Sequence, residues 1–453
     1  MNDYSTYIES KKNLKNDFGF KPTFLPDFLF DFQKYIVEWA VRKGRSGIFS
    51  DCGTGKTIMQ LVWAKNVIKK TNKPVLLLTP LSVTIQTEKE ADKFGILAKK
   101  YTGKIHDIVI TNYQKLHYFD PSKFSGIVCD ESSILKNFDG KIKNQITQFV
   151  KKIPYRSLWT ATAAPNDYIE LGTSSEALGY LGYVDMLNKF FKNDQNNSSL
   201  GRVYGKLVKW RFKGHAEIPF WKWVSTWALS MRKPSDLNFD DGNFILPDLI
   251  ENIHVIKNNI PVNNGFFNYV TGISQEREMR KITIKQRCEK VAELANKIKA
   301  PVLIWCNLNE EGDLLEKIIP DGLQVAGKHR DEIKEERLIG FANNDFRVLI
   351  TKPKIGAWGL NYQHCSNIIN FPTHSYEQYY QGIRRCWRFG QKNKVIVDNI
   401  IPECDRYIFK NLERKKKAAE IMFERLLQYM NDINFKEKTE LNNKIKLPKW
   451  IIN

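Results

Sequence analysis

The sequence predicts an α/β protein of two lobes, each built on a parallel sheet, with an inserted, mainly helical subdomain and a helical C-terminal tail. Short apolar runs alternate with stretches of helical periodicity in residues 25–172 and again in residues 249–405, which is typical of parallel sheets wrapped by helices. The alternation lapses in residues 173–248. The chain has 453 residues, enough for about two to three separate cores.

Charge and composition narrow the functional classes. The formal net charge of +20 and the pI near 9.4 favour a polyanionic partner, with nucleic acid the leading candidate and an anionic membrane surface the second. No apolar run approaches the roughly 20 residues of a membrane span, and the start of the chain is unlike a signal peptide. The seven cysteines contain no C-x-x-C pair, which indicates reduced core residues and not a disulfide frame or a zinc site. We therefore expect a cytoplasmic protein without membrane contact.

The chain begins with a polar stretch, residues 1–24, that we expect to be a loosely held arm. A run with apolar residues at helical spacing follows in residues 29–40 and contains Gln33. A glutamine amide offers both a donor and an acceptor to the edge of a base, so Gln33 is a candidate for binding adenine. A plain amphipathic helix is the alternative.

The next apolar run ends in a glycine-bearing loop that closes with Gly-Lys-Thr and is followed by a predicted helix. Gly53 and Gly55 allow the backbone to turn its N–H groups toward phosphate oxygens. Lys56 would reach the β- and γ-phosphates, and Thr57 would ligate Mg²⁺. Ser50 stands where the full pattern has its first glycine, so an ordinary loop is the alternative. The residues assigned to the nucleotide are Gly53, Thr54, Gly55, Lys56 and Thr57.

Four further apolar runs follow this loop, and each ends in a polar cluster. In a parallel sheet these clusters meet at one edge, where ligands collect. Asp130 and Glu131 directly follow the third run. They supply what nucleotide hydrolysis needs, because Asp130 can hold Mg²⁺ and Glu131 can orient and deprotonate the attacking water. A pair of solvated surface acids is the alternative. The four runs are residues 75–78, 108–110, 126–129 and 157–159.

The predicted insert, residues 173–248, interleaves aromatic and basic residues. Lys209, Arg211 and Lys213 alternate with aromatic side chains, a pattern that suits a surface stacking on bases or gripping phosphates. The alternative is a small helical subdomain whose tryptophans form its own core.

The second lobe repeats the alternation and carries two further clusters. One is the glycine-bearing segment 356–361, which follows a strand ending in Thr351. The other contains Arg385 and Arg388, which are three residues apart and would share one face of a helix. From that face their guanidinium groups could reach a γ-phosphate as arginine fingers, or form a basic helix that contacts phosphates. Residues 406–453 are predicted as a basic helical tail.

In this order the motifs resemble superfamily 2 helicases, whose two lobes are RecA-like. Asp130-Glu131-Ser132-Ser133-Ile134-Leu135-Lys136-Asn137 is similar to the Asp-Glu-Ala-His-x-x-Lys-Asn of Swi/Snf-type translocases, and Arg388-Phe389-Gly390-Gln391 is like their Arg-Ile-Gly-Gln. Ser132-Ser133 departs from Ala-His. The compact size resembles helicase-like ATPases encoded by bacteriophages.

The resemblance implies ATP and Mg²⁺ as cofactors, with catalytic roles for Lys56, Asp130, Glu131, Arg385 and Arg388, and with Thr57 and Asp130 as metal ligands. It also implies that Gly359 lies at the nucleotide. The residues expected to contact nucleic acid are Thr79, Thr111, Thr160, Thr162, Lys209, Arg211, Lys213, Thr351, Gly356 and Asn361.

These features together predict a DNA-dependent ATPase that translocates on, remodels or unwinds double-stranded or branched DNA in replication, recombination or repair. We expect a monomer, located in the host cytoplasm if the protein is viral. Two alternatives remain open from sequence: a nucleic-acid-binding protein that uses ATP only as a conformational switch, and an RNA helicase.

Overall fold

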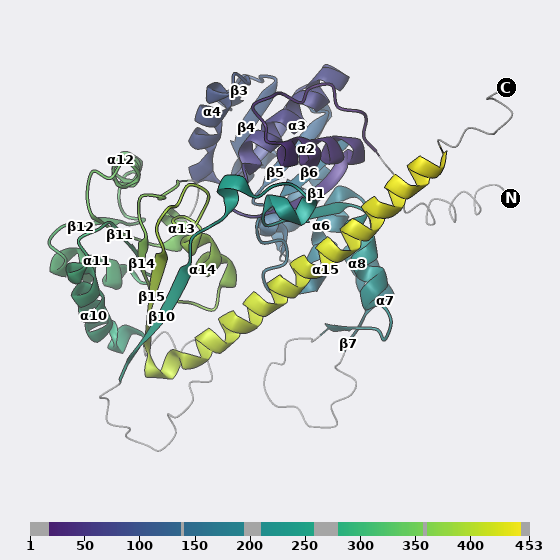
Figure 1. The fold of residues 1–453 in the computed structure, drawn as a ribbon. Coiled ribbons are helices and arrows are strands. Elements are labelled where there is room, and N and C mark those ends of the chain that lie inside the picture. Colours follow the sequence, from purple (N-terminus) through teal and green to yellow (C-terminus); the bar gives the residue numbers. More distant parts are fainter. Residues whose placement is uncertain (1–17, 137–139, 194–209, 258–279, 357–359, 445–453) are drawn as a thin grey trace, which may run out of the picture. The chain divides into compact units, whose positions relative to one another are not determined.

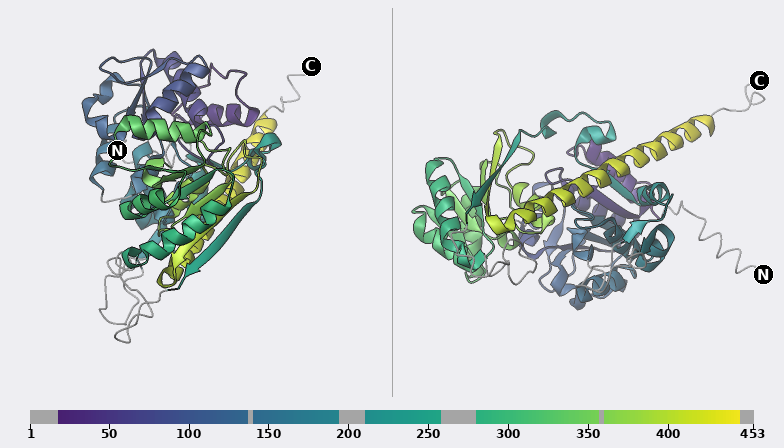
Figure 2. Two further views of the ribbon diagram at one scale, coloured as in Figure 1. Left: turned by 90° about the vertical axis from the view of Figure 1, so that its left-hand side faces the viewer. Right: turned by 90° about the horizontal axis from the view of Figure 1, so that it is seen from below.

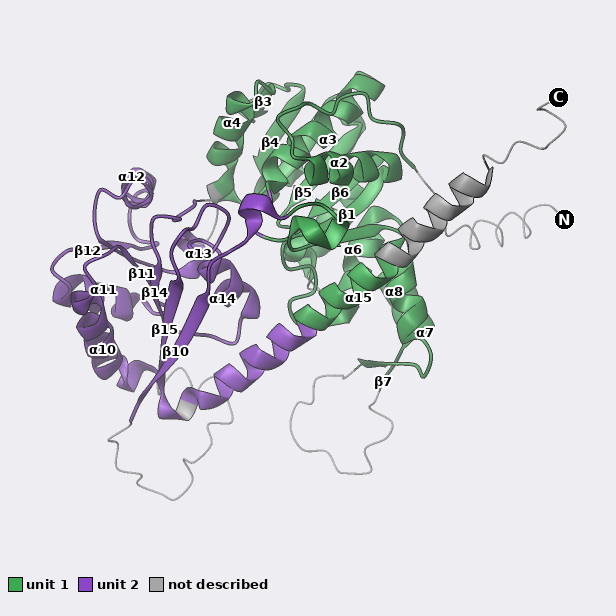
Figure 3. Cartoon of the chain, viewed as in Figure 1, with its two compact units in different colours: residues 1–51, 55–240, 419–453 green, residues 52–54, 241–418 purple. Residues whose placement is uncertain are grey.

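The structure is a computed structural model that describes residues 18–136, 140–193, 210–257, 280–356 and 360–444. The chain divides into two compact units, one of residues 1–51, 55–240 and 419–453 and the other of residues 52–54 and 241–418 (Figure 3). Each unit contains one large parallel sheet with helices packed around it (Figures 1 and 2). The predicted α/β class with two parallel sheets is therefore confirmed.

The first unit is built on a seven-stranded sheet. Every strand in it pairs in parallel with its neighbours, for example β2 with both β4 and β5. The strands β2, β4 and β5 are buried along their whole length, as expected for apolar runs covered on both faces. The order across the sheet is β3 (Ala98–Lys100), β4 (Ile108–Asn112), β2 (Val75–Thr79), β5 (Gly126–Asp130), β6 (Tyr155–Trp159), β1 (Arg45–Ser50) and β9 (Ala228–Met231).

The helices of the first unit begin and end where the sequence provides the right residues. The helix α2 ends at Gly44, whose φ of +68° is the left-handed conformation that glycine adopts without strain. The helix α3 ends at Asn72, which also has a positive φ. The α-helices described in this unit are α2 (Asp31–Lys43), α3 (Lys56–Thr71), α4 (Thr84–Lys93), α5 (Lys141–Val150), α6 (Leu171–Leu178), α7 (Tyr183–Phe190) and α8 (Glu217–Ser225).

The segment predicted as a separate insert, residues 173–248, is largely part of the first unit. Its strand β9 pairs in parallel with β1 and extends the sheet. Trp221 and Trp227 are fully buried, so the tryptophans form core, as the alternative interpretation of this segment expected. A short antiparallel hairpin of β7 (Phe191–Asn193) and β8 (Trp210–Phe212) also lies in it. The boundary predicted after residue 172 is corrected, because the four residues of β9 are too few to show a strand pattern.

The second unit contains a six-stranded parallel sheet. Alternate residues of its central strand β11 point to opposite faces, as strand geometry requires. Val302 and Ile304 join one buried apolar cluster, whereas Leu303 and Trp305 join another. The sheet is therefore covered on both sides. Its order is β10 (Leu249–Ile256), β15 (Val395–Pro402), β14 (Asn367–Asn370), β11 (Val302–Trp305), β13 (Val348–Thr351) and β12 (Gly322–Val325).

Helices of the second unit alternate with these strands. The helix α14 begins at a capping serine, Ser375, whose side chain accepts a hydrogen bond from the Gln378 backbone N–H. The α-helices that lie wholly in this unit are α10 (Ile284–Lys297), α11 (Asn309–Ile318), α12 (Asp331–Ala342), α13 (Pro353–Gly356) and α14 (Tyr376–Ile383). None of the helices in the described part of the chain is long and apolar enough to cross a membrane.

The predicted tail is one long helix, α15 (Arg406–Lys444), that belongs to both units. Its residues up to 418 count with the second unit, and those from 419 on count with the first. Phe423 and Leu426 are buried, and the sulfur of Met430 accepts a hydrogen bond from the Ser230 N–H of β9. The helix is therefore a packed part of the fold and not a separate tail.

The N-terminal segment also differs from the prediction of a loose arm where it is described. The backbone N–H of Phe18 donates to the Lys43 carbonyl, and that of Thr23 donates to the Asn66 side chain. Residues 18–24 are thus attached to α2 and α3, while residues 1–17 of the predicted arm lie outside the described part.

Candidate nucleotide site and its surroundings

The predicted phosphate loop connects the end of β1 to the start of α3. Gly53 and Gly55 both have φ near +85°, at +88° and +84°, which strains any residue with a side chain. Lys56 is the first residue of α3, and its ammonium donates to the carbonyls of Ser50 at 3.0 Å and Asp51 at 3.2 Å. The lysine is therefore held over the loop by backbone acceptors that an anion with stronger acceptors can replace.

Gln33 lies against this loop. It is buried in the first turn of α2, and its Oε1 accepts a hydrogen bond from the Phe30 N–H at 3.1 Å. A Cβ placed on Gly55 would lie 2.4 Å from the Gln33 amide nitrogen, and the φ of +84° disfavours any residue with a side chain there. The structure thus brings Gln33 to the loop, and its contact with adenine stays a prediction.

Asp130 lies at the carboxyl end of β5 and is held by two side chains. Gln60 donates from its Nε2 to the Oδ1 of Asp130 at 2.7 Å, and the Thr79 hydroxyl donates to its Oδ2 at 3.4 Å. Burial raises the pKa of the Asp130 carboxyl, while the hydrogen bond from Gln60 and the charge of Lys56 act in the opposite direction. Lys56 and Asp130 therefore share one electrostatic environment.

The sequence interpretation missed Gln60. It lies four residues after Lys56 on α3, hence on the same face of the helix, and is 1% exposed. The signal available in the sequence was a glutamine four residues after the lysine.

Glu131 has an unusual backbone conformation. Its φ is +50°, in the left-handed region that residues with a β-carbon rarely adopt, and the side chain is mostly buried. The carbonyl of the preceding residue, Asp130, accepts a hydrogen bond from the Tyr113 hydroxyl at 2.5 Å. The 3₁₀ helix η4 (Ser132–Lys136) follows directly. Strained backbone at a candidate general base is consistent with a conformation set by function. Tyr113, which holds the neighbouring carbonyl, is a second residue that the sequence interpretation missed.

The chemistry of this edge fits a magnesium ion. Thr57, in the first turn of α3, offers a hydroxyl oxygen and Asp130 a carboxylate. Mg²⁺ prefers oxygen ligands and usually takes only one or two from protein, with water and phosphate filling the remaining positions. The described residues contain no cluster of three or more His, Cys, Asp or Glu that could hold a metal by itself. The donor set therefore suits an ion that arrives with a phosphate ligand.

Several threonines predicted to contact nucleic acid are buried in the structure. Thr79 is fully buried on Asp130. Thr160 accepts a hydrogen bond from the backbone N–H of Thr162, and both are buried. Thr111 is also buried. These threonines are buried near the carboxyl ends of the strands, and their contact with nucleic acid stays a prediction.

In the hairpin of the first unit, Arg211 is exposed on β8. Lys213 donates from its ammonium to the Asn188 carbonyl. Lys209 lies outside the described residues. Arg211 and Lys213 stay predictions as nucleic-acid contacts.

The two candidate arginine fingers do not lie on a helix. The helix α14 ends at Ile383, and Arg385 and Arg388 follow in turns. Both nevertheless reach the same loop, because Arg385 donates to the Leu360 carbonyl at 3.3 Å and Arg388 donates to the Asn361 side chain. The predicted shared helical face is wrong, but the two guanidinium groups converge by another route.

Arg385 is 7% exposed and has no carboxylate within ion-pairing distance among the described residues. Its Nε is buried there without a hydrogen-bond acceptor. A buried cation without an anionic partner is costly, so this group is suited to an anion from outside the chain.

The glycine-bearing segment of the second unit is described only in part. Gly356 ends α13, and a Cβ there would lie 2.6 Å from the Thr351 methyl group. The Thr351 hydroxyl is buried and donates to the Val325 carbonyl, and its contact with nucleic acid stays a prediction. Asn361 accepts the hydrogen bond from Arg388. Gly359 lies outside the described residues.

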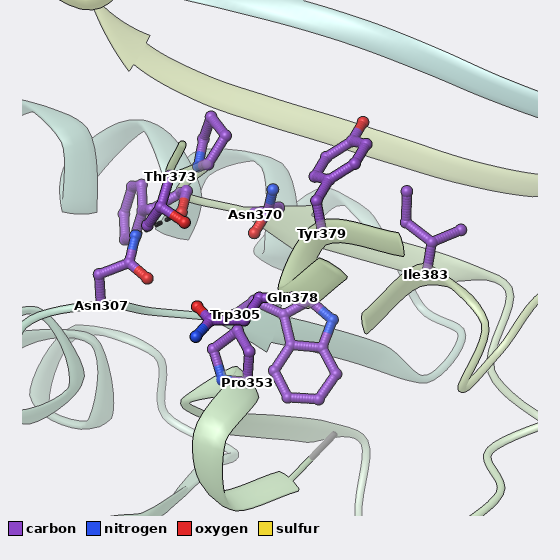
Figure 4. A pocket seen from close by; sticks show the side chains of 10 residues that line it. Trp305, Asn307, Pro353, Asn370, Thr373, Gln378, Tyr379 and Ile383 are labelled. Atoms are coloured by element: carbon purple, nitrogen blue, oxygen red, sulfur yellow. Dashed lines mark hydrogen bonds between the residues drawn. The ribbon is translucent and has the colours of Figure 1, made fainter. Parts of the chain in front are cut away.

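A pocket that the sequence interpretation did not single out opens at the carboxyl edge of the second sheet (Figure 4). It combines an indole with several amide side chains. Asn307 donates to the Phe371 carbonyl at 2.5 Å, and Asn370 donates to the Asn399 side chain at 3.1 Å. The pocket lies where parallel strands end, the edge at which ligands collect. Its labelled lining includes Trp305, Asn307, Pro353, Asn370, Thr373, Gln378, Tyr379 and Ile383.

Part of the second unit matches a known protein family, and the fold is similar to that of solved structures. Residues 286–390 match the Helicase conserved C-terminal domain. Among solved structures, the chain is similar to S. cerevisiae Dbp5 bound to Gle1 and IP6, with a TM-score of 0.50 and 13% identity over 86% of each chain. An identity this low shows the fold alone.

A second similar structure is the Sulfolobus solfataricus SWI2/SNF2 ATPase core in complex with dsDNA, at 19% identity over 95% of this chain and 98% of that one. Its TM-score of 0.41 is too low to carry an argument. No curated protein matches the sequence.

Proposed function

We propose that this protein is a nucleic-acid-dependent ATPase that uses hydrolysis to translocate on DNA and to remodel or unwind it. The observation that carries the proposal is the cluster at the ends of β1 and β5. There Lys56 rests on loop carbonyls within the electrostatic reach of Asp130, and Glu131 follows in a left-handed turn. These are the parts that ATP hydrolysis requires.

The phosphate loop provides the binding step. The Lys56 ammonium exchanges the carbonyls of Ser50 and Asp51 for the β- and γ-phosphate oxygens, which are charged and therefore stronger acceptors. Gln33 lies beside Gly55, and in this proposal it would hold the base. Thr57 and Asp130 would hold Mg²⁺, which would neutralise charge on the phosphates.

The hydrolytic step needs a base and a charge-stabilising group. Glu131 orients a water and accepts its proton while the water oxygen bonds to the γ-phosphorus and the bond to the ADP oxygen breaks. Arg385 and Arg388 are the candidates for stabilising the charge on the transferred phosphoryl group, since Arg385 is buried without an anionic partner among the described residues.

The nucleic-acid partner is inferred from charge and resemblance. A net charge of +20 favours a polyanion. The similarity of residues 130–137 and 388–391 to Swi/Snf-type translocases favours DNA, and duplex tracking over strand separation. RNA as the substrate and ATP as a switch without turnover are the competing functions.

An ATPase assay with and without nucleic acid tests the proposal. We expect hydrolysis that DNA stimulates and that Lys56→Ala abolishes, while Lys104→Ala, an exposed lysine in a loop, behaves like the unmutated protein. Absent hydrolysis in the unmutated protein, with every nucleic acid tried, would contradict the motor and favour the switch.

Two further measurements define the substrate. Single-stranded DNA, duplex DNA and RNA are compared as stimulators, and stimulation by RNA alone would replace the DNA proposal. A triplex-displacement assay beside a strand-displacement assay then separates duplex tracking from unwinding. Displacement of the third strand without separation of the duplex is the expected result.

A further inference from the structure

The 3₁₀ helix η2 (Tyr113–Tyr118) directly follows β4 and has two distinct faces. Its outward residues are exposed and combine polar, basic and aromatic side chains, which suits contact with a nucleic-acid strand. Its inward residues, Tyr113 and Leu116, are buried. The same short element is therefore both surface and core. The exposed residues are Gln114, Lys115, His117 and Tyr118.

The inward face reaches the candidate catalytic turn through one hydrogen bond. The Tyr113 hydroxyl donates to the carbonyl oxygen of Asp130 at 2.5 Å. A phenol keeps its proton near neutral pH, so this hydroxyl is a donor.

The acceptor of this hydrogen bond, the Asp130 carbonyl, directly precedes the candidate general base Glu131 in the chain. The Asp130 carbonyl belongs to the peptide plane that joins Asp130 to Glu131, and rotation of that plane changes the φ of Glu131. That φ is +50°, a conformation that persists only where the surroundings hold it. A donor fixed on the Asp130 carbonyl therefore helps to set the direction in which Glu131 leaves the strand.

We propose that Tyr113 is a positioning residue that couples nucleic-acid binding on the outward face of η2 to the catalytic conformation of Glu131. A strand bound to the outward residues holds η2 in place, and Tyr113 then holds the Asp130–Glu131 peptide. Without the strand, small movements of η2 release this peptide. This inference rests on the proposed function and adds the means by which nucleic acid stimulates hydrolysis.

The test is the ratio of stimulated to unstimulated kcat in Tyr113→Phe, which keeps the ring and removes only the hydroxyl. We expect the ratio to fall about tenfold, the effect of one lost hydrogen bond of this kind, while the KM for ATP changes little. Tyr155→Phe, on β6 of the same sheet, is the matched control and should leave the ratio unchanged.

Variants on the outward face keep the test valid if Tyr113→Phe folds poorly. Lys115→Ala and Tyr118→Ala change exposed side chains and should also lower the ratio. In the double variant of Tyr113→Phe with Lys115→Ala, the loss in the ratio should be less than the sum of the two single losses on a free-energy scale. The reason is that both substitutions interrupt the same coupling from η2 to Glu131.

Two results would overturn the coupling while leaving the ATPase intact. One is an unchanged ratio of stimulated to unstimulated kcat in Tyr113→Phe. The ratio is unchanged if both rates persist, and also if both fall by the same factor, as a purely structural role would require. The other is normal stimulation in both outward variants. An unmutated protein that no nucleic acid stimulates would instead overturn the proposed function, and the coupling with it.

Discussion

Gln60 donates a hydrogen bond from its amide nitrogen to the Oδ1 of Asp130 at 2.7 Å, and both residues are buried. Gln60 is on α3, the helix that begins with Lys56, whereas Asp130 ends β5. The bond thus links the helix that begins with the candidate phosphate-binding lysine to the strand that ends with the candidate magnesium ligand. The other carboxylate oxygen receives a longer bond, 3.4 Å, from the Thr79 hydroxyl and is the better candidate ligand for a metal.

Replacing Gln60 by methionine should weaken the response to Mg²⁺. The variant Gln60→Met keeps the length of the side chain but removes the donor that orients Asp130. Partners of this kind typically change metal affinity or activity by about 10–100-fold, so we expect the Mg²⁺ concentration for half-maximal ATPase activity to rise by about tenfold or more. Gln148→Met, at an exposed position of α5, is the control. An unchanged Mg²⁺ requirement would show that Gln60 only satisfies a buried carboxylate.

Replacing the candidate base should separate binding from hydrolysis. Glu131→Gln keeps the shape of the side chain at the left-handed position but cannot accept the proton of the attacking water. General-base catalysis contributes about 10²–10⁴ in rate, so kcat should fall by that factor while ATP binding, measured with a fluorescent analogue, is retained. Activity within a few-fold of the unmutated protein would assign the base elsewhere.

The arginines after α14 should act on the rate and not on binding. Arg388→Lys keeps a positive charge but loses the planar fork. Arginine fingers supply about 10³ or more in kcat, and we expect a loss of this order with little change in the affinity for ATP. Arg406→Lys, at an exposed position at the start of α15, is the control. A loss confined to ATP affinity would make Arg388 a binding residue.

The parts of the fold that could be predicted from sequence are those with a strong local signal. The apolar runs ending at Thr79 and Asp130 became β2 and β5, because four or five consecutive apolar residues are readily buried on both faces of a parallel sheet. The glycines at 53 and 55 marked a loop with positive φ, as found. The sequence pattern of a segment is sufficient to predict its structure where that structure depends mainly on the segment's own residues.

Features that depend on distant contacts could not be predicted. The strand β9 is only four residues long, and it is a strand because it pairs with β1, about 180 residues earlier in the chain. Arg385 and Arg388 had helical spacing, yet α14 stops at Ile383. Tyr113 had no local signal either, since its hydrogen-bond acceptor, the carbonyl of Asp130, lies 17 residues away in the sequence at the end of β5. Tertiary contacts decided each of these.

The helix α15 should contribute stability through its buried face. Phe423 is buried in the first unit, and the Arg232 guanidinium lies 4.4 Å from its ring centroid. Phe423→Ala should lower the free energy of unfolding by about 3–5 kcal/mol, the usual cost of such a cavity. Ile421→Ala, two residues earlier and 44% exposed, is the control and should cost much less. Equal effects in urea unfolding would show that α15 is not packed at Phe423.

Glu170 should make stability depend on pH near neutrality. Burial raises the pKa of its carboxyl from 4.5 to about 7, while two hydrogen bonds from Asn166 oppose that shift. Since the folded pKa is the higher one, the folded state binds the proton more tightly. The stabilisation is complete below pH 4.5 and is lost as pH rises through about 7.

The lost stability from Glu170 is on the order of 3 kcal/mol, taken from the size of that shift. Glu170→Gln resembles the protonated form and should remove this contribution, so its urea unfolding should change less between pH 5 and pH 8 than that of the unmutated protein. Glu38→Gln, at an exposed position on α2, should keep the original pH dependence. The same slope in Glu170→Gln as in the unmutated protein would mean that Glu170 is ionised in the folded state throughout this range.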